Sequence, residues 1–220
     1  MRAPCLLASA PGLLLVLAAC ASVALPTAPE APAWTPLFSG TSLGDFVSTD
    51  FGGQGEVAVR DGRIHLGFGS PLTGITWTGA APTGSYELEV VAARADGSDF
   101  FAGITFPVGD DHLTLVLGGW GGSLCGLSSI DGNDAAHNDT RTHRQFADHV
   151  DHTVHIVVTG AAVAAALDGA PLCRAERSGH RFSLRPEVTL QKPLGIASFA
   201  TASCIRSVRW RPLQGSVPTP

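Results

Sequence analysis

Turn signals recur every eight to twelve residues between about residue 34 and residue 212, and the runs between them have the composition of β-strands. Glu56–Arg60 and Arg63–Leu66 flank Asp61-Gly62, a dipeptide that tolerates the positive φ of a tight hairpin turn. Polar and apolar residues alternate over Ser85–Ala92, as in a half-buried strand. Because no window of helical length shows a clean apolar stripe with caps, strands are the expected element throughout.

A second hairpin is expected at Val154–Thr159 and Ala162–Leu167. The alanine-rich second arm favours a helix by propensity, but the turn residues at Gly160 and Asp168-Gly169 bracket it at strand length; a short helix is the alternative. Further strands are predicted at Phe101–Phe106, His112–Leu117, Ser123–Ile130, Leu194–Phe199 and Ile205–Trp210. Many short strands without intervening helices predict an all-β jelly roll of two antiparallel sheets.

The N-terminus has the parts of an export signal. Arg2 supplies a positive charge, and an apolar stretch follows over Leu6–Ala19. Leu17-Ala18-Ala19-Cys20 resembles the lipobox of bacterial lipoproteins, in which the cysteine receives a diacylglyceryl group before cleavage in front of it. We therefore predict a lipoprotein signal peptide at residues 1–19 and lipidation of Cys20. The alternative is an ordinary secretory signal with an accidental cysteine at this position.

The chain after the signal divides into three parts. Residues 20–33 form an Ala/Pro-rich, lipidated tether, and residues 34–212 are long enough for one jelly-roll domain. Residues 213–220 are expected to be a disordered tail. The predicted location is the cell envelope, on the periplasmic or the outer-membrane face, with the membrane contacted through the lipid anchor only.

Charge and cysteine content limit the partners and the cross-links. The formal net charge is -5 and no basic run is present, so nucleic acid is excluded as an expected partner. Cys125, Cys173 and Cys204 are left in the domain, an odd number for an oxidising compartment. Cys173 and Cys204 could form a disulfide, whereas Cys125 lies in an apolar strand pattern and is expected to be buried.

Several segments together resemble the 3-keto-disaccharide hydrolase family. Trp34–Phe46 is similar to the family's "LFNGKDLSGW" opening, Asp61–Ile64 to its "DGxL" hairpin and Tyr86–Val90 to its "FELxxE" strand. Pro193–Phe199 and Ile205–Trp210 resemble its last two strands. The resemblance spans nearly the whole domain and implies a concanavalin-like β-sandwich that acts on carbohydrate.

One segment departs from the family pattern. Where the family has "NSGxxxR" on a central strand, this chain has Phe100–Phe106, which keeps Gly103 but lacks the polar pair and the arginine. Three functions therefore stay open: a 3-keto-glycoside lyase or hydrolase, a non-catalytic carbohydrate-binding module, and a structural surface lipoprotein.

Polar residues concentrate between Gly118 and Asp139. Trp120 is flanked by glycines, so its ring is expected either to stack on the apolar face of a sugar or to plug one end of the sandwich. Asn138 and Asp139 are expected to help bind the substrate. Asp131, Asn133, Asp134 and Asp139 offer oxygen ligands for a divalent cation such as Ca²⁺, although capping of a solvated turn is the favoured interpretation.

Histidines gather between His137 and His155. Strand alternation would place His149, Asp151 and His155 on one face, which is a weak indication of a metal site. Exposed histidines on a polar face are the simpler interpretation.

The family resemblance implies chemistry on a sugar with a ketone at C3. A base removes the acidified proton on C2, the enolate expels the substituent on C1, and water adds to the resulting glycal. The candidate acids and bases are His112, Asp131, Asp134 and Glu187. Arg185, Lys192 or a divalent ion could stabilise the enolate, and we assign both side chains to substrate binding.

Overall fold

The computed structural model describes residues 31–213. The predicted signal peptide (residues 1–19), the lipidation site Cys20, tether residues 20–30 and tail residues 214–220 lie outside this range. Within it, no helix is long and apolar enough to cross a bilayer.

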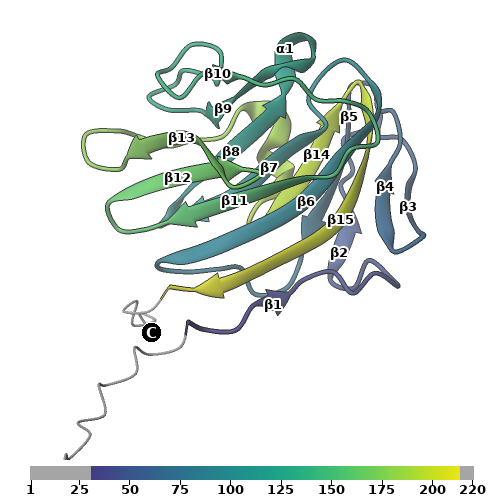
Figure 1. The fold of residues 1–220 in the computed structure, drawn as a ribbon, viewed down its shortest axis with the longest axis horizontal. Helices are drawn as coiled ribbons and strands as arrows, with labels where there is room; N and C mark the ends of the chain where they lie inside the picture. The colour runs from purple at the N-terminus through teal and green to yellow at the C-terminus, as the bar shows by residue number, and fades with distance from the viewer. Residues whose placement is uncertain (1–30, 214–220) are drawn as a thin grey trace, which may run out of the picture. The chain divides into compact units, whose positions relative to one another are not determined.

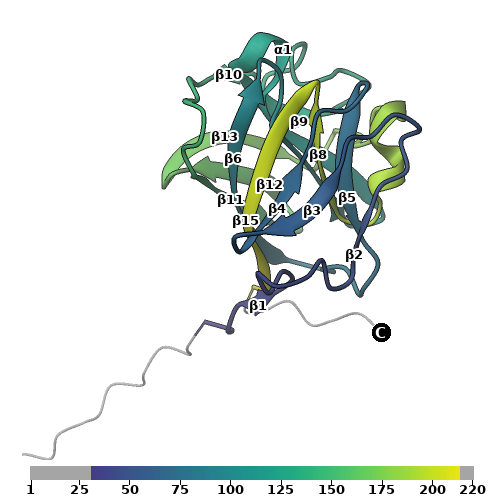
Figure 2. The ribbon, with the colours of Figure 1, turned by 90° about the vertical axis from the view of Figure 1, so that its right-hand side faces the viewer.

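The described residues form two antiparallel β-sheets packed face to face (Figures 1 and 2), which confirms the all-β prediction. Sheet A contains β13 (Ala170–Glu176), β12 (Ala162–Leu167), β11 (His152–Val158), β6 (Tyr86–Gly97), β15 (Thr201–Pro212), β4 (Arg63–Leu66) and β3 (Val57–Arg60), with β1 (Thr35–Pro36) paired to β15. Sheet B contains β10 (Thr142–His143), β9 (Leu124–Ser128), β8 (Asp111–Gly118), β7 (Ala102–Val108), β14 (Gly195–Phe199), β5 (Leu72–Trp77) and β2 (Phe46–Ser48). The two short helices are α1 (Gly119–Gly122) and η1 (Pro186–Gln191).

Both predicted hairpins are present, β3 with β4 around Asp61-Gly62 and β11 with β12 around residues 159–161, and Asp168-Gly169 forms a further turn between β12 and β13. Asp61 and Gly62 have φ values of 52° and 72°, and Asp168 and Gly169 have 51° and 80°. This pair of left-handed residues matches the right-handed twist of the strands that the turn joins. The alanine-rich arm is therefore strand β12, paired with β11 on one side and β13 on the other, and the two ladders override its helical propensity.

Side chains alternate along β6 as predicted. Leu88 and Val90 are fully buried between the sheets, while Glu87 and Glu89 point outward and pair with Arg211 and Arg209 on β15. The core between the sheets also contains Tyr86, whose hydroxyl donates a 2.5 Å hydrogen bond to the Pro107 carbonyl on β7. This bond joins sheet A to sheet B, and burial raises the pKa of the Tyr86 phenol well above its usual value.

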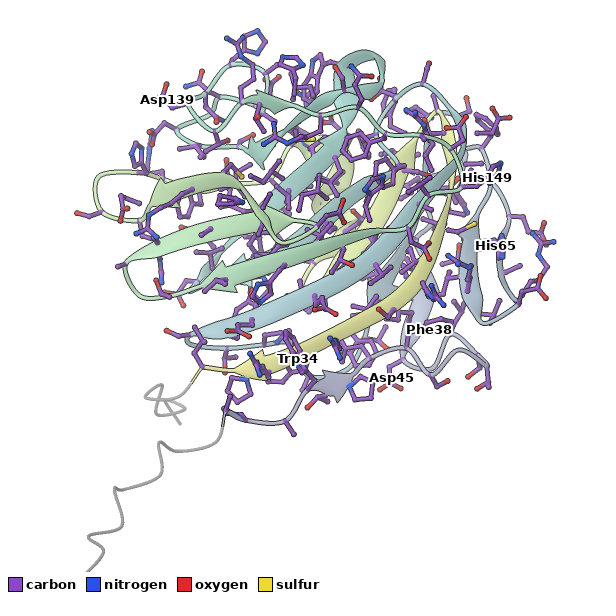
Figure 3. All side chains as sticks on the ribbon, viewed as in Figure 1. Trp34, Phe38, Asp45, His65, Asp139 and His149 are labelled. Atoms are coloured by element: carbon purple, nitrogen blue, oxygen red, sulfur yellow. The ribbon has the colours of Figure 1, made fainter. Side chains whose placement is uncertain are left out.

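Trp34 anchors the start of the described chain to the outer face of sheet A (Figure 3). The guanidinium carbons of Arg209 and Arg211 lie 4.7 Å and 4.5 Å from the Trp34 ring centroid, in cation–π geometry. The ring also meets His155 edge-on, with 6.1 Å between centroids. The N-terminal segment is thus fixed on β15 next to the short strand β1.

Cys173 and Cys204, which the sequence left as a possible pair, do not form a disulfide in the structure. Both thiols are free, and β12, β11 and β6 separate the strands that carry them. Four strand spacings amount to roughly 19 Å, far beyond the Cα separation that a disulfide spans. Cys125 is fully buried on β9, as predicted.

The predicted face of His149, Asp151 and His155 is wrong because His149 is not part of a strand. It has a φ of 62° and precedes β11, which begins at His152. His152 instead pairs with Asp168, and His155 pairs with Glu87.

Candidate functional site

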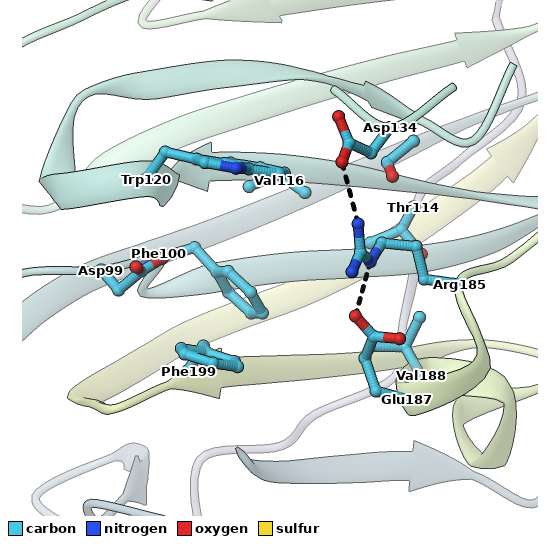
Figure 4. A pocket seen from close by; sticks show the side chains of 11 residues that line it. Asp99, Phe100, Thr114, Val116, Trp120, Asp134, Arg185, Glu187, Val188 and Phe199 are labelled. Carbon is cyan, nitrogen blue, oxygen red and sulfur yellow. Dashed lines mark hydrogen bonds and ion pairs between the residues drawn. The ribbon is translucent and has the colours of Figure 1, made fainter. Parts of the chain in front are cut away.

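A pocket of about 330 Å³ lies on the outer face of sheet B, away from sheet A. Leu115 and Leu127 of this sheet are fully buried in the core, so their neighbours Thr114, Val116 and Ser128 face outward by strand alternation. The loop of residues 129–141 and helix η1 cover this face on two sides. The pocket is lined by Asp99, Phe100, Thr114, Val116, Trp120, Ser128, Asp134, Arg185, Glu187, Val188 and Phe199 (Figure 4).

A tight glycine turn presents Trp120 to the pocket. Gly118, Gly121 and Gly122 have φ values of 76°, 89° and 99°, and Trp120 itself has a φ of 48°. A left-handed conformation costs an aromatic residue roughly 1–2 kcal/mol, so the turn holds this ring at an energetic cost. Trp120 is 45 % exposed and lines the pocket, which favours the predicted stacking platform over a plug at the end of the sandwich.

Two phenylalanines form the apolar side of the pocket. The rings of Phe100 and Phe199 lie 5.6 Å apart between centroids, and both pack in the cluster around Val188 of η1. Asp99 fixes the position of Phe100 because its Oδ1 accepts a 2.7 Å hydrogen bond from the Phe100 N–H. Figure 4 shows Phe100 lying between Trp120 and Phe199 at this end of the pocket.

The other end carries an ion-paired group of three side chains. Arg185 donates from Nη1 to Asp134 Oδ2 at 2.9 Å and from Nε to Glu187 Oε1 at 2.5 Å. Arg185 and Glu187 are 43 % and 38 % exposed, so solvent reaches both. Asp134 is less exposed and also receives His137 Nδ1 at 2.6 Å and the Ala136 N–H at 3.0 Å.

Asp134 stays ionised at neutral pH. Partial burial works to raise its pKa, but the hydrogen bonds from His137 and Ala136 and the charges of His137 and Arg185 outweigh burial and lower the pKa below its usual value. This carboxylate can therefore accept hydrogen bonds or orient Arg185, and it is a poor proton donor.

A short backbone pairing brings these distant segments together. Ser129 and Ser183 exchange two hydrogen bonds of 3.1 Å, and the Asp131 N–H donates to the Arg181 carbonyl at 2.8 Å. The loop after β9 is thereby joined to the segment before η1, and Asp134 reaches Arg185. Pro186 then occupies the first turn of η1, a position that suits proline, and Glu187 follows in the same turn.

Of the predicted site residues, Trp120, Asp134, Arg185 and Glu187 meet in the pocket. Asn138 does not line it, because its side chain supports the loop: Nδ2 donates to the Leu127 and Asp134 carbonyls at 2.8 Å each, and Oδ1 accepts from the Thr140 N–H and hydroxyl. Asn138 therefore positions the backbone of Asp134.

Four further predicted residues lie outside the pocket lining: His112, Asp131, Asp139 and Lys192, the last of which directly follows η1. Asp131 binds His180 Nδ1 at 2.7 Å and the Arg181 N–H at 2.8 Å, and these bonds lower its pKa. Asp139 is exposed on the same loop. His112 is on β8, and burial, followed by the charge of Lys192, lowers its pKa. Their proposed catalytic and binding roles stay predictions.

Sequence reasoning missed Asp99, Ser128 and Phe199. Ser128 is 2 % exposed, lines the pocket, and its hydroxyl has no hydrogen-bond partner among residues 31–213. Phe100 was visible only as part of the departure from the family pattern. The alternation on β9 could have indicated the outward direction of Ser128, but nothing local indicates that η1 covers it.

The described residues contain no group of three His, Cys, Asp or Glu side chains arranged to hold a metal ion. Asp131 and Asp134 in particular turn to different partners, His180 and Arg185. The proposed divalent cation therefore has no preformed site of that kind in this part of the chain.

Solved structures share this fold at low sequence identity. The chain is similar to a Crh5 transglycosylase in complex with NAG (18 % identity, TM-score 0.57, covering 84 % of this chain and 88 % of that one). It is also similar to a putative glycosyl hydrolase from Parabacteroides distasonis (12 %, 0.54, 82 % and 94 %) and to carbohydrate-binding module CBM66 from Bacillus subtilis (11 %, 0.51, 74 % and 93 %). These similarities confirm the concanavalin-like jelly roll. No family model and no curated protein matches the chain, so membership of the 3-keto-disaccharide hydrolase family stays a prediction.

Proposed function

We propose that the pocket on sheet B binds a carbohydrate. The observation that carries this proposal is Trp120, an exposed aromatic ring held by a strained turn at a pocket whose opposite end is charged. A sugar ring has an apolar face and a rim of hydroxyls, so it needs both kinds of surface at once.

The two ends of the pocket supply these surfaces. Trp120 and Phe100 offer flat apolar area for stacking, and Arg185 and Glu187 offer a donor and an acceptor for hydroxyl groups. Ligand pockets run from about 300 Å³ upward, so the observed volume suits one or two sugar rings. Strained backbone in proteins concentrates at functional sites, which agrees with the left-handed Trp120.

The fold comparisons support the same ligand class. The similar structures include, by their names, a carbohydrate-binding module and a transglycosylase in complex with NAG. Both are too distant in sequence to transfer a residue or a sugar to this chain, so the support extends only to carbohydrate as a class.

The test is a binding screen of the purified full chain against immobilised oligosaccharides, followed by calorimetry on the sugars that bind. Trp120→Ala should weaken binding at least tenfold, because one aromatic platform is removed. Phe68→Ala is the matched control, since Phe68 is 50 % exposed but does not line the pocket. If Trp120→Ala binds as well as the parent chain, the pocket is not the site.

A catalytic function on 3-keto-glycosides is the second candidate. Glu187 Oε1 accepts a hydrogen bond from Arg185 Nε, and Oε2 has no partner among the described residues, so Glu187 can act as the base for the proton on C2. Arg185 can then stabilise the enolate oxygen. The leaving sugar also needs a proton donor, and the lowered pKa of Asp134 makes this residue unsuitable at neutral pH. Binding is therefore the function that the geometry supports better.

Incubation with 3-keto-trehalose separates the two candidates. Release of free sugar that is lost in Glu187→Gln would establish the lyase or hydrolase. Loss of this sugar release in the presence of EDTA would show that the reaction also needs a divalent cation. Binding without any release would leave the binding module. If the chain neither binds a sugar nor releases one from 3-keto-trehalose, the structural surface lipoprotein would be favoured.

We further propose that the chain is a lipid-anchored protein of the cell envelope. The proposal rests on the Leu17-Ala18-Ala19-Cys20 sequence, which resembles a lipobox. Expression in a bacterium fed with labelled palmitate should label the parent chain and leave Cys20→Ala unlabelled. Equal labelling of the parent chain and of Cys20→Ala would show that Cys20 is not the lipidation site.

A further inference from the structure

The pocket carries an excess of acidic groups. Three carboxylates line it, from Asp99, Asp134 and Glu187, against the single guanidinium of Arg185. Arg185 already forms ion pairs with two of them, Asp134 and Glu187, so no cation is left to neutralise the third. His137 contacts Asp134 from outside and is 70 % exposed, so solvent screens whatever charge it carries.

The acidic groups lie at both ends of the pocket. Asp99 precedes Phe100, and its Oδ1 would lie 3.8 Å from a Cβ placed on Gly119, so this carboxylate sits beside the turn that carries Trp120. Asp134 and Glu187 lie at the opposite end (Figure 4). A ligand that stacks on Trp120 is therefore near a carboxylate whichever way round it binds.

Ser128 is an independent indication that a polar group belongs in the pocket. A buried hydroxyl without a partner is costly and is normally satisfied by protein, water or ligand. The Ser128 hydroxyl is such a group, and the residue lines the pocket.

We propose that this pocket selects amino sugars with a free, protonated amine and rejects acidic sugars. This proposal rests on the carbohydrate site proposed above. An ammonium group beside Asp99 or Glu187 gains a charge-assisted hydrogen bond, which an acetylated amine or a hydroxyl cannot match. A uronate or sulfated sugar would bring a further negative charge next to carboxylates that have no free cation, so like-charge repulsion excludes it.

Calorimetry with matched sugar series tests this proposal. Each series contains a hexosamine, its N-acetylated form and the corresponding uronate, as short oligomers, in gluco and in galacto configuration. At mildly acidic pH and low salt, the free amine should bind about tenfold more tightly than the acetylated form, and the uronate should not bind. The preference should shrink severalfold at roughly 0.5 M salt, because partly exposed charges are screened there.

Two isosteric variants locate the selectivity. Asp99→Asn and Glu187→Gln should each reduce the preference for the amine, with Asp110→Asn, an exposed acid outside the pocket lining, as the matched control. Ser128→Ala should weaken all bound sugars alike and leave the preference unchanged, because it removes a neutral group.

The outcomes separate this proposal from the one it rests on. Equal or tighter binding of the acetylated sugar, or binding of a uronate at the Trp120 pocket, overturns the selectivity and leaves carbohydrate binding intact. An unchanged preference in both Asp99→Asn and Glu187→Gln also overturns it. If no sugar of any charge binds, both proposals fail together.

Discussion

Replacing Arg185 with glutamine should destabilise the protein at neutral pH and have little effect in acid. Arg185 is the only partner that joins Asp134 to Glu187 within residues 31–213, so the variant breaks both ion pairs at once. Glutamine keeps most of the side-chain volume, and Arg185 is 43 % exposed, so little packing is lost.

The expected cost follows from the exposure of the groups. An exposed ion pair contributes roughly 0.2–1 kcal/mol, and both pairs here are partly exposed, so the loss should be about 1 kcal/mol in the free energy of unfolding. The pKa of Asp134 is lowered in the folded protein, mainly by its hydrogen bonds and the nearby charges acting against burial. Its stabilising contribution is therefore full above the unfolded pKa of about 3.9 and disappears as the pH falls through the lowered folded value.

Urea unfolding of the parent chain and of Arg185→Gln at neutral pH and at about pH 2 measures this difference. Arg174→Gln is the control, because the Arg174–Glu176 pair is 59 % and 57 % exposed and should contribute nearly nothing. An equal cost at both pH values would refute the electrostatic explanation and assign the effect to packing.

Further expected outcomes concern the support of the site and the core. Tyr86→Phe should lower the free energy of unfolding by about 1 kcal/mol in urea, because the bond to the Pro107 carbonyl between the sheets is lost; no change would mean that the bond contributes nothing. Asn138→Ala should cost about 2 kcal/mol and weaken sugar binding, whereas Asn133→Ala on the same loop should leave binding intact, and equal effects would refute the bracing role. Of the three domain cysteines, Cys204 should react with Ellman's reagent first in peptide mapping. Burial raises the pKa of Cys125 to about 11 and of Cys173 to about 12, so both should react only after unfolding, and early labelling of either would contradict the described packing.

The fold could be predicted well because turns and strand faces are specified by residues close together in the sequence. Asp61-Gly62 and Asp168-Gly169 specify hairpin turns whatever the rest of the chain does, and both adopt the positive φ values expected. The alternation of Glu87 and Leu88 likewise fixes which face of β6 is buried. The alanine-rich β12 was harder, because its state depends on ladders to β11 and β13.

The site depends on contacts that local sequence does not contain. The glycines around Trp120 were a usable signal for an exposed ring, and the structure places it in the pocket. Asp131 and Asp134 looked equivalent in the sequence. Only the pairing of residues 129–131 with residues 181–183 brings Asp134 to Arg185 and Asp131 to His180. Phe199 and Ser128 were missed because η1, more than fifty residues after β9, closes the pocket around them.

The attachment of Trp34 to sheet A has a mechanical consequence. Tension applied to the N-terminal end of the described chain enters the sandwich through the Trp34 ring and β1, and both transfer the load to β15. β15 lies inside sheet A between β6 and β4, so it spreads the force over neighbouring ladders. Most of the pocket lies on the other sheet, where residues of β8, β9 and η1 form it. The far end of β15 reaches the pocket, because the Thr201 hydroxyl accepts a 3.0 Å hydrogen bond from the Asp99 N–H, so a pull on the N-terminal end is felt first at the Asp99 end of the pocket.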